Sequence, residues 1–191
     1  MNHNKISNAG AKTLAESKLV QNISCLMLEA NQIGVNGAQS FATSLNLKNL
    51  ETLFLDSNPI GPEGAEALAR STCLPSLTAL HMDSTGIGDQ GVRAIAASQT
   101  LSKIEKLYLC SNKIGDEGAI ALSQSPNLSH LTCLSIWRNE IRDAGGKAIA
   151  ESNHFLKLER LYMSLNLIEK PTRKLIRTSD MASRLKTLVM D

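Results

Sequence analysis

The chain has 191 residues, of which 42% are hydrophobic and only 3% aromatic, and its formal net charge is +2. So small a net charge excludes broad electrostatic attraction to nucleic acid. No apolar run approaches the roughly 18 residues that a membrane span requires, so no membrane-spanning segment is predicted. The opening residues MNHNKISNAG hold no apolar stretch after their single lysine, which excludes the pattern of a secretory signal.

A period of 27 residues runs through the chain without an insertion. A fixed period of about 20 to 50 residues is the signature of a solenoid, in which each unit contacts only its neighbours. We therefore expect one domain over residues 1–191, with about seven repeats and no clear capping units. The period is marked by one column of polar residues: Asn4, Asn31, Asn58, Thr85, Asn112, Asn139 and Asn166.

Each unit begins with a short expected strand. Apolar residues alternate before the Asn, as at Leu53 and Leu55. This alternation is typical of a strand with one buried face. An isoleucine such as Ile60 follows the Asn by two positions in every unit, and we expect it to point into the core where the chain bends.

A short helix is predicted after the bend. A glycine such as Gly64 opens a segment in which Ala65, Leu68 and Ala69 have the spacing of one helix face. The small alanines would let the helix lie close to the sheet. Each unit is therefore expected to contribute one strand and one amphipathic helix.

Two polar columns are predicted to bond backbone groups at the bends. A serine such as Ser71 recurs near the expected helix end in every unit, where its hydroxyl can bond free backbone groups. The Asn column can do the same at the other bend. Thr85 has a hydroxyl but no carboxamide, so its bend is expected to be the least well bonded of the interior bends.

The unit LxxLxLxxNxIGxxGAxxLA resembles a leucine-rich repeat of the ribonuclease-inhibitor-like subtype, and the resemblance covers nearly the whole chain, from Asn4 to Met190. It implies an α/β fold: a right-handed solenoid forming a curved horseshoe segment. The parallel sheet would line the concave face and the helices the convex face. Similar repeats occur in cytosolic innate-immune receptors, the Ran GTPase-activating protein and bacterial leucine-rich-repeat effectors. Because the motif residues are core residues, the resemblance says little about function.

The residues between the buried leucines of each strand should face the concave side, and they include most of the aromatic residues. Aromatic and arginine side chains are enriched at the centres of protein interfaces, although aromatics also suit a strand surface by propensity alone. We favour a partner-binding surface. Its aromatic candidates, with the histidine of the same column, are Phe54, His81, Tyr108, Trp137 and Tyr162.

Charged residues on the same face are sorted by half. Glu29, Asp56 and Asp83 form an acidic row in the N-terminal half. The basic residues of the C-terminal half are Lys106, Arg138 and Arg160. The alternative interpretation is that these are ordinary solvated surface charges. The predicted partner site is completed by five of the charged residues: Asp56, Asp83, Lys106, Arg138 and Arg160.

No catalytic residue, metal ligand or cofactor is predicted. His81, Asp83 and Cys110 share the concave face, but diagonal neighbours about 7–8 Å apart are too distant for a nucleophile to bond its base. The four cysteines lack metal-ligand spacing, and free thiols fit a reducing compartment. We therefore expect a cytoplasmic protein, or one exported by a bacterium into the host cytosol.

The predicted function is a non-enzymatic protein-binding module, with neither nucleic acid nor membrane as partner. It could act as a bacterial effector in a host cell or as a fragment of a cytosolic receptor. A second hypothesis, from the resemblance, is a GTPase-activating or other GTPase-regulating protein. A third hypothesis is a structural unit that associates end to end through its open terminal repeats. The edge strand of a sheet has unpaired backbone groups that can pair with another chain.

Overall fold

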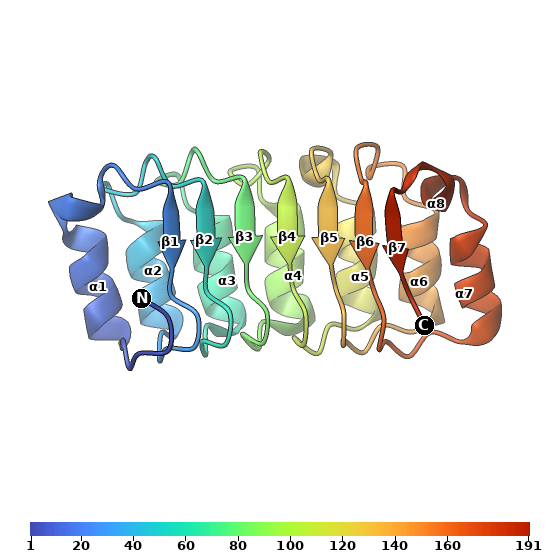
Figure 1. Cartoon of the computed structure of the whole chain (residues 1–191), viewed down its shortest axis with the longest axis horizontal. Helices are drawn as coiled ribbons and strands as arrows, with labels where there is room; N and C mark the ends of the chain where they lie inside the picture. Colours follow the sequence, from blue (N-terminus) through green and yellow to red (C-terminus); the bar gives the residue numbers. More distant parts are fainter.

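The computed structural model describes all 191 residues as a row of strand–bend–helix units (Figure 1). The strands are β1 (Cys25–Met27), β2 (Thr52–Phe54), β3 (Ala79–His81), β4 (Lys106–Tyr108), β5 (Cys133–Ser135), β6 (Arg160–Tyr162) and β7 (Thr187–Val189). The α-helices are α1 (Asn8–Glu16), α2 (Val35–Ala42), α3 (Gly61–Ala69), α4 (Gly88–Ala97), α5 (Asp116–Ser123), α6 (Asp143–Ala150), α7 (Lys170–Arg177) and α8 (Asp180–Arg184). Two short 3-10 helices are η1 (Lys18–Val20) and η2 (Pro126–Leu128).

All seven strands form one parallel sheet in the order β1 to β7. Residues one repeat apart are paired, as Leu53 is with Leu80 and Leu80 with Leu107. Because the repeat length never changes, every strand keeps the same register, and each position of the unit becomes a column across the sheet. The predicted α/β solenoid with a parallel sheet is confirmed.

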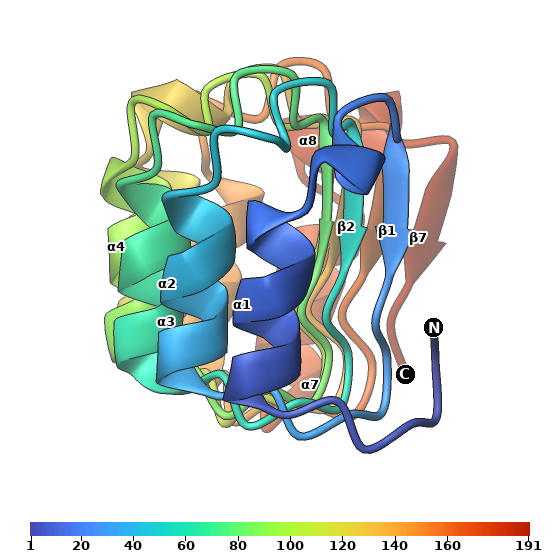
Figure 2. The ribbon, with the colours of Figure 1, turned by 90° about the vertical axis from the view of Figure 1, so that its left-hand side faces the viewer.

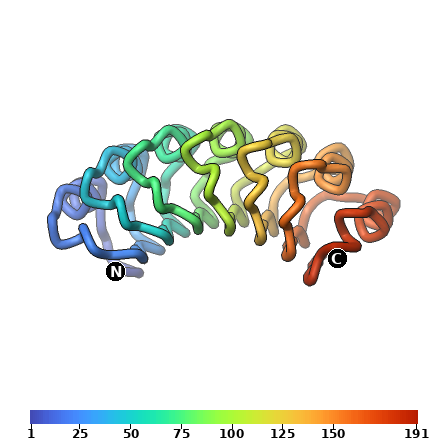
Figure 3. The backbone as a smooth tube through the Cα atoms, turned by 90° about the horizontal axis from the view of Figure 1, so that it is seen from above, coloured from blue at the N-terminus to red at the C-terminus, as the bar shows by residue number.

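Helices and strands form two separate layers. Seen from one end, the helices lie on one side and the strands on the other (Figure 2). Seen from above, the chain is an arc with the helices along its outer side and the strands along its inner side (Figure 3). Neighbouring strands lie about 4.8 Å apart, whereas packed helices need about 8–10 Å, so the layer of strands takes the concave side.

A continuous core of 46 buried hydrophobic residues fills the space between the layers. Leu53, Leu55, Ile60 and Leu68 have no exposed surface, as the alternation, the bend and the helix spacing predicted. The helix layer therefore packs on the sheet through the apolar stripes of its helices.

The helices begin before the glycines that were expected to open them. Helix α3 starts at Gly61, and Gly64 lies inside it. A Cβ atom on Gly64 would lie 2.7 Å from Cγ2 of Ile60 and 3.2 Å from Cβ of Ala38. The glycine is needed because the helix approaches both the bend of its own unit and the preceding helix.

The Asn column forms the predicted ladder between bends. Asn58 accepts a hydrogen bond at Oδ1 from the N–H of Ile33, at 3.0 Å. Its Nδ2 donates to the carbonyl oxygens of Leu28 and Leu55, at 2.8 and 3.0 Å. One buried carboxamide thus bonds the backbone of its own unit and of the preceding unit, where neither sheet nor helix can do so.

The serine column also bonds backbone groups, but its main target is the preceding helix. The hydroxyl of Ser71 donates to the carbonyl oxygen of Ala42 at 2.6 Å, and that of Ser44 to Ala15 at 2.6 Å. Ala42 is the last residue of α2, so each serine bonds a carbonyl that the helix end leaves free. Ser17 and Ser179 are different: the hydroxyl of Ser17 accepts the N–H of Leu19, and that of Ser179 donates to Ile176 in its own unit.

A third polar column, which the sequence analysis missed, joins the helix N-termini. Oδ1 of Asp89 accepts hydrogen bonds from the N–H groups of Gly115 and Gly118, at 2.7 and 3.0 Å. Asp116 bonds the next unit in the same way, through the N–H groups of Arg142 and Gly145. These carboxylates bond N–H groups that the first turn of a helix leaves free.

The side chain of Thr85 makes fewer hydrogen bonds than those of Asn58 and Asn112, as expected, but its hydroxyl is not left unpaired. The hydroxyl of Thr85 donates to the carbonyl oxygen of Met82 at 2.6 Å. Oδ1 of Asn112 accepts the N–H groups of Thr85 and Gly86, at 3.0 and 2.8 Å. In the preceding unit the N–H of Ile60 donates to the carbonyl oxygen of Asn58 instead of to a side chain. The bends on both sides of Thr85 therefore have a hydrogen-bond arrangement of their own.

The residue before the Asn column has a left-handed backbone in every unit. Ser84, for example, has φ of 56° without being glycine. Such a conformation crowds the Cβ atom of an L-residue and costs free energy. The column comprises His3, Ala30, Ser57, Ser84, Ser111, Arg138 and Leu165.

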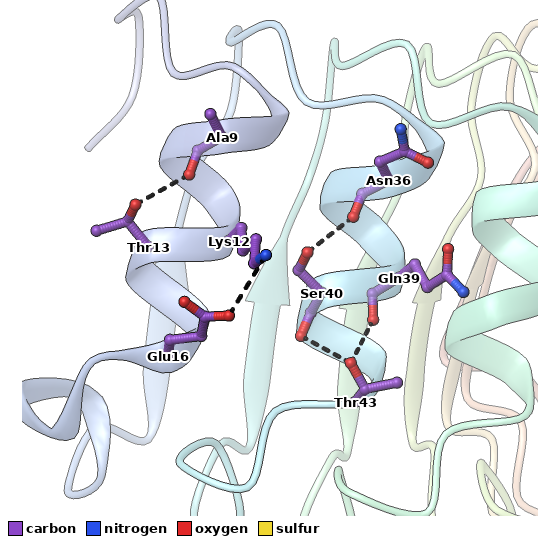
Figure 4. A network of polar contacts seen from close by, with 8 residues as sticks. All are labelled: Ala9, Lys12, Thr13, Glu16, Asn36, Gln39, Ser40 and Thr43. Atoms are coloured by element: carbon purple, nitrogen blue, oxygen red, sulfur yellow. Dashed lines mark hydrogen bonds and ion pairs between the residues drawn. The ribbon is translucent and has the colours of Figure 1, made fainter.

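The outer surface of the helix layer is polar, and its hydroxyls bond their own helices. In α1, Thr13 donates to the carbonyl oxygen of Ala9; in α2, Ser40 donates to Asn36 (Figure 4). The ion pair of Lys12 and Glu16 has 3.8 Å between its charged atoms and is exposed. No helix has the length and apolar character needed to cross a membrane.

Candidate functional site

The strand positions between the core leucines all lie on the concave side, in columns. The last residues of the seven strands form the column of Met27, Phe54, His81, Tyr108, Ser135, Tyr162 and Val189. Trp137 follows β5 by two residues and is 37% exposed, whereas Phe41 and Phe155 are buried in the core. The structure therefore places Phe54, Tyr108, Trp137 and Tyr162 on the strand side, as the sequence analysis expected.

Three rings of this column form a continuous stack. The centroid of His81 lies 3.9 Å from that of Phe54, with the planes tilted by 30°. On the other side it lies 4.1 Å from that of Tyr108, with the planes 14° apart. Strands about 4.8 Å apart bring equivalent side chains to stacking distance. Sequence reasoning placed these residues in one column but did not predict the stack.

Stacking keeps the imidazole of His81 neutral. Burial between the two rings, followed by the positive charge of Lys106, lowers the pKa of His81 from 6.5 to about 4. The side chain makes no hydrogen bond, so nothing offsets the loss of water around a charged imidazole. At neutral pH the stack is therefore an uncharged aromatic surface.

The acidic row is largely occupied by backbone contacts. Oδ1 of Asp56 accepts the N–H of Asp83 at 2.7 Å, and Oδ1 of Asp83 accepts the N–H of Cys110 at 2.6 Å. Burial raises the pKa of Asp56 to about 6, and burial also raises the pKa of Asp83. Both carboxyl groups join neighbouring units, a role that the sequence analysis did not predict.

The basic residues have no such role. Lys106 and Arg138 are exposed, and Arg160 is half-buried. None of them belongs to the four ion pairs in the structure. Arg138 lies beyond β5 in the left-handed bend, so only Lys106 and Arg160 belong to the strands themselves.

Two strand residues approach Cys133 from opposite sides. The thiol of Cys133 lies 3.6 Å from the hydroxyl oxygen of Tyr108 and donates to it. Burial, followed by this contact, raises the pKa of Tyr108 to about 12. Proximity to Cys133, and then to the phenols of Tyr108 and Tyr162, raises the pKa of Arg160. Tyr108 on β4 and Arg160 on β6 thus come close to one thiol on β5.

Not every position between the core leucines is free for a partner. Ala79, Cys133 and Ser135 are buried, and so is Cys110 beyond β4. These side chains are therefore not free to contact a partner, although their positions alternate with the core leucines as predicted. They are small residues beside larger ones, and the neighbouring side chains cover them. That difference in size was visible in the sequence.

The grouping of His81, Asp83 and Cys110 does not form a catalytic arrangement. The thiol of Cys110 lies 3.0 Å from the hydroxyl of Ser135, and burial raises its pKa to about 11. A thiol that stays protonated is a poor nucleophile, and His81 is held in the ring stack. No group of three His, Cys, Asp or Glu side chains has the geometry of a metal site.

The fold defines a class of protein: a solenoid whose repeats stack to expose one continuous sheet face. Four segments match the family described as Leucine Rich repeat, at residues 46–69, 73–96, 100–123 and 127–150, which together are just over half of the chain. The chain belongs to this leucine-rich-repeat family. Such repeats are generally non-catalytic protein–protein interaction modules. No curated protein matches the sequence.

Proposed function

We propose that this chain binds a protein partner on the concave face of its sheet. The centre of the site would be the ring stack of Phe54, His81 and Tyr108, continued by Trp137 and Tyr162. Aromatic side chains provide large apolar area at a small cost in conformational entropy, and they are enriched among the residues that dominate binding.

The observation that carries this proposal is the placement of the aromatic residues. Only Phe41 and Phe155 are in the core, although burial of aromatic rings is strongly favourable. The other four lie along the sheet surface, and Trp137 keeps 37% of its surface exposed. An apolar surface of this kind, with polar and charged neighbours, is typical of an interaction site.

The same proposal includes the finer assignments. An α-helix in every unit supports the ribonuclease-inhibitor-like subtype, because other repeats of this family can have 3-10 helices there. Four free thiols support a reducing compartment such as a cytosol. A bacterial effector in a host cell, or part of a cytosolic receptor, would both be consistent with that compartment.

The test is capture of a partner by the immobilised chain, compared between two double variants. In the first, Trp137→Ala and Tyr162→Ala remove rings from the concave face. In the control, Leu19→Ala and Leu45→Ala remove apolar side chains elsewhere that are more exposed, at 91% and 71%. We expect the first variant to lose the captured protein and the control to keep it. Equal capture by both variants would exclude the part of the concave face that Trp137 and Tyr162 form.

A further inference from the structure

The C-terminal half of the concave face has positive charge that the chain does not neutralise. Lys106 on β4 and Arg160 on β6 begin two strands that flank β5. The ion pairs of the structure join Lys12 to Glu16, Arg70 to Glu66, Arg93 to Glu117 and Lys186 to Glu159, and none includes Lys106 or Arg160.

Arg160 also has an unmet hydrogen-bonding group. Its Nε atom is buried and has no hydrogen-bond partner in the structure. The groups near its guanidinium include the thiol of Cys133 and the phenols of Tyr108 and Tyr162, none of which is a carboxylate. The carboxylate of Glu159 also interacts with its charge, but it forms an ion pair with Lys186. A buried donor without an acceptor costs free energy. The outer N–H groups of the same guanidinium are not buried and have no partner in the chain, so an anionic acceptor brought by a ligand could bind them.

The carboxylates of the same face cannot supply that acceptor. Asp56 and Asp83 follow β2 and β3, at the opposite end of the strands from Arg160. Each already accepts a backbone N–H from the next unit. Glu159, next to Arg160 in the chain, is already paired with Lys186. We therefore expect the charge that complements Lys106 and Arg160 to come from a partner.

Resting on the proposed function, we propose that an acidic segment of a protein partner binds this half of the face. A carboxylate of that segment would pair with Arg160, and a second with Lys106, while Tyr108 and Tyr162 pack against its side chains. Arginine favours carboxylates because its planar guanidinium can donate two parallel hydrogen bonds. Two cations on a chain of net charge +2 suit a few carboxylates better than the many phosphates of a nucleic acid.

The test begins with a phage-displayed library of random peptides, selected on the immobilised full chain. Each enriched peptide is then synthesised, and its affinity is measured for the wild type and for the Trp137→Ala, Tyr162→Ala variant. Single-stranded RNA and phosphatidylserine vesicles are measured beside the peptides. Both proposals are supported if the enriched peptides are acidic and bind the Trp137→Ala, Tyr162→Ala variant more weakly than the wild type.

Other outcomes separate the two proposals. If the enriched peptides lose affinity for the Trp137→Ala, Tyr162→Ala variant but are neutral or basic, the proposal of an acidic partner is overturned. The proposal that the concave face binds a partner is then still supported. The absence of any face-dependent peptide overturns both. Binding of RNA or vesicles that depends on Arg160, without binding of acidic peptides, assigns the site to another class of ligand and overturns the inference.

A charge comparison provides the second measurement. We expect Arg160→Gln and Lys106→Gln each to weaken an enriched acidic peptide on the order of tenfold or more, as loss of one partner of a charged contact does. Lys174→Gln, on the outer helix α7, removes the same charge at an exposed position away from the sheet and should change the affinity little. Equal weakening by all three variants would show a nonspecific charge effect and overturn the inference.

Discussion

The imidazole ring of His81 lies on the phenol ring of Tyr108, with centroids 4.1 Å apart and planes 14° apart. The contact joins β3 to β4 at the centre of the concave face, and Phe54 extends it to β2. Stacking that buries a titratable ring on a binding surface makes both stability and the charge of that surface sensitive to pH.

The first prediction concerns acid stability and His81. Its folded pKa of about 4 is below its ordinary value of 6.5, so its contribution to stability is present above pH 6.5 and is lost as pH falls toward 4. His81→Phe keeps an aromatic ring and removes the titration. We expect the urea midpoint of this variant to fall less than that of the wild type between these pH values. An identical pH dependence in the two proteins would contradict the burial of a neutral imidazole.

The second prediction concerns Asp56, which changes stability with pH in the opposite direction to His81. The folded pKa of Asp56, about 6, is above its ordinary 3.8, so its contribution is fully present below pH 3.8 and is lost as pH rises through 6. Asp56→Asn keeps an oxygen that can accept the N–H of Asp83. On acidification from pH 6 toward 4, its urea midpoint should fall relative to the wild type. A rise relative to the wild type would show that the carboxyl group is not destabilised by burial.

The third prediction tests the left-handed column before the Asn ladder. Ser84 has φ of 56° and is exposed, and its hydroxyl makes no hydrogen bond. Ser84→Gly should stabilise the protein by about 0.5 to 1 kcal/mol, because relief of backbone strain exceeds the entropy that glycine adds to the unfolded chain. Ser84→Ala is the control, since it removes the same hydroxyl and keeps the Cβ atom. Urea unfolding that gives equal midpoints for the two variants would exclude the strain.

The fourth prediction ranks two members of the Asn ladder. Asn112 has no exposed surface, and its Oδ1 accepts hydrogen bonds from the N–H groups of Thr85 and Gly86. Asn166 is half-buried, and its Oδ1 accepts only from Ile141. We expect Asn112→Ala to cost about 2 to 3 kcal/mol and Asn166→Ala about 1 kcal/mol. Chemical denaturation of both variants checks the order, and a larger cost at Asn166 would contradict it.

The repeat pattern was sufficient to predict the solenoid, the parallel sheet and the hydrogen-bonding roles of the Asn and serine columns. Residues equivalent to Leu53, Asn58 and Ile60 recur at one spacing, so the structure inferred for one repeat applies to every repeat. The pattern also placed Phe54, Tyr108, Trp137 and Tyr162 on the sheet surface, because side chains alternate along a strand. These features depend on position within the unit, which a sequence displays directly.

The tertiary structure decided what the side chains on that surface do to one another. Asp56 bonds the backbone at Asp83, and Tyr108 and Arg160 both approach Cys133. These contacts join residues about one repeat apart, and they depend on side-chain direction as well as on register. Thr85 is a further case, since its hydrogen bonds depend on how the neighbouring bends adjust. Such contacts differ from unit to unit, so a pattern that averages over the units cannot contain them.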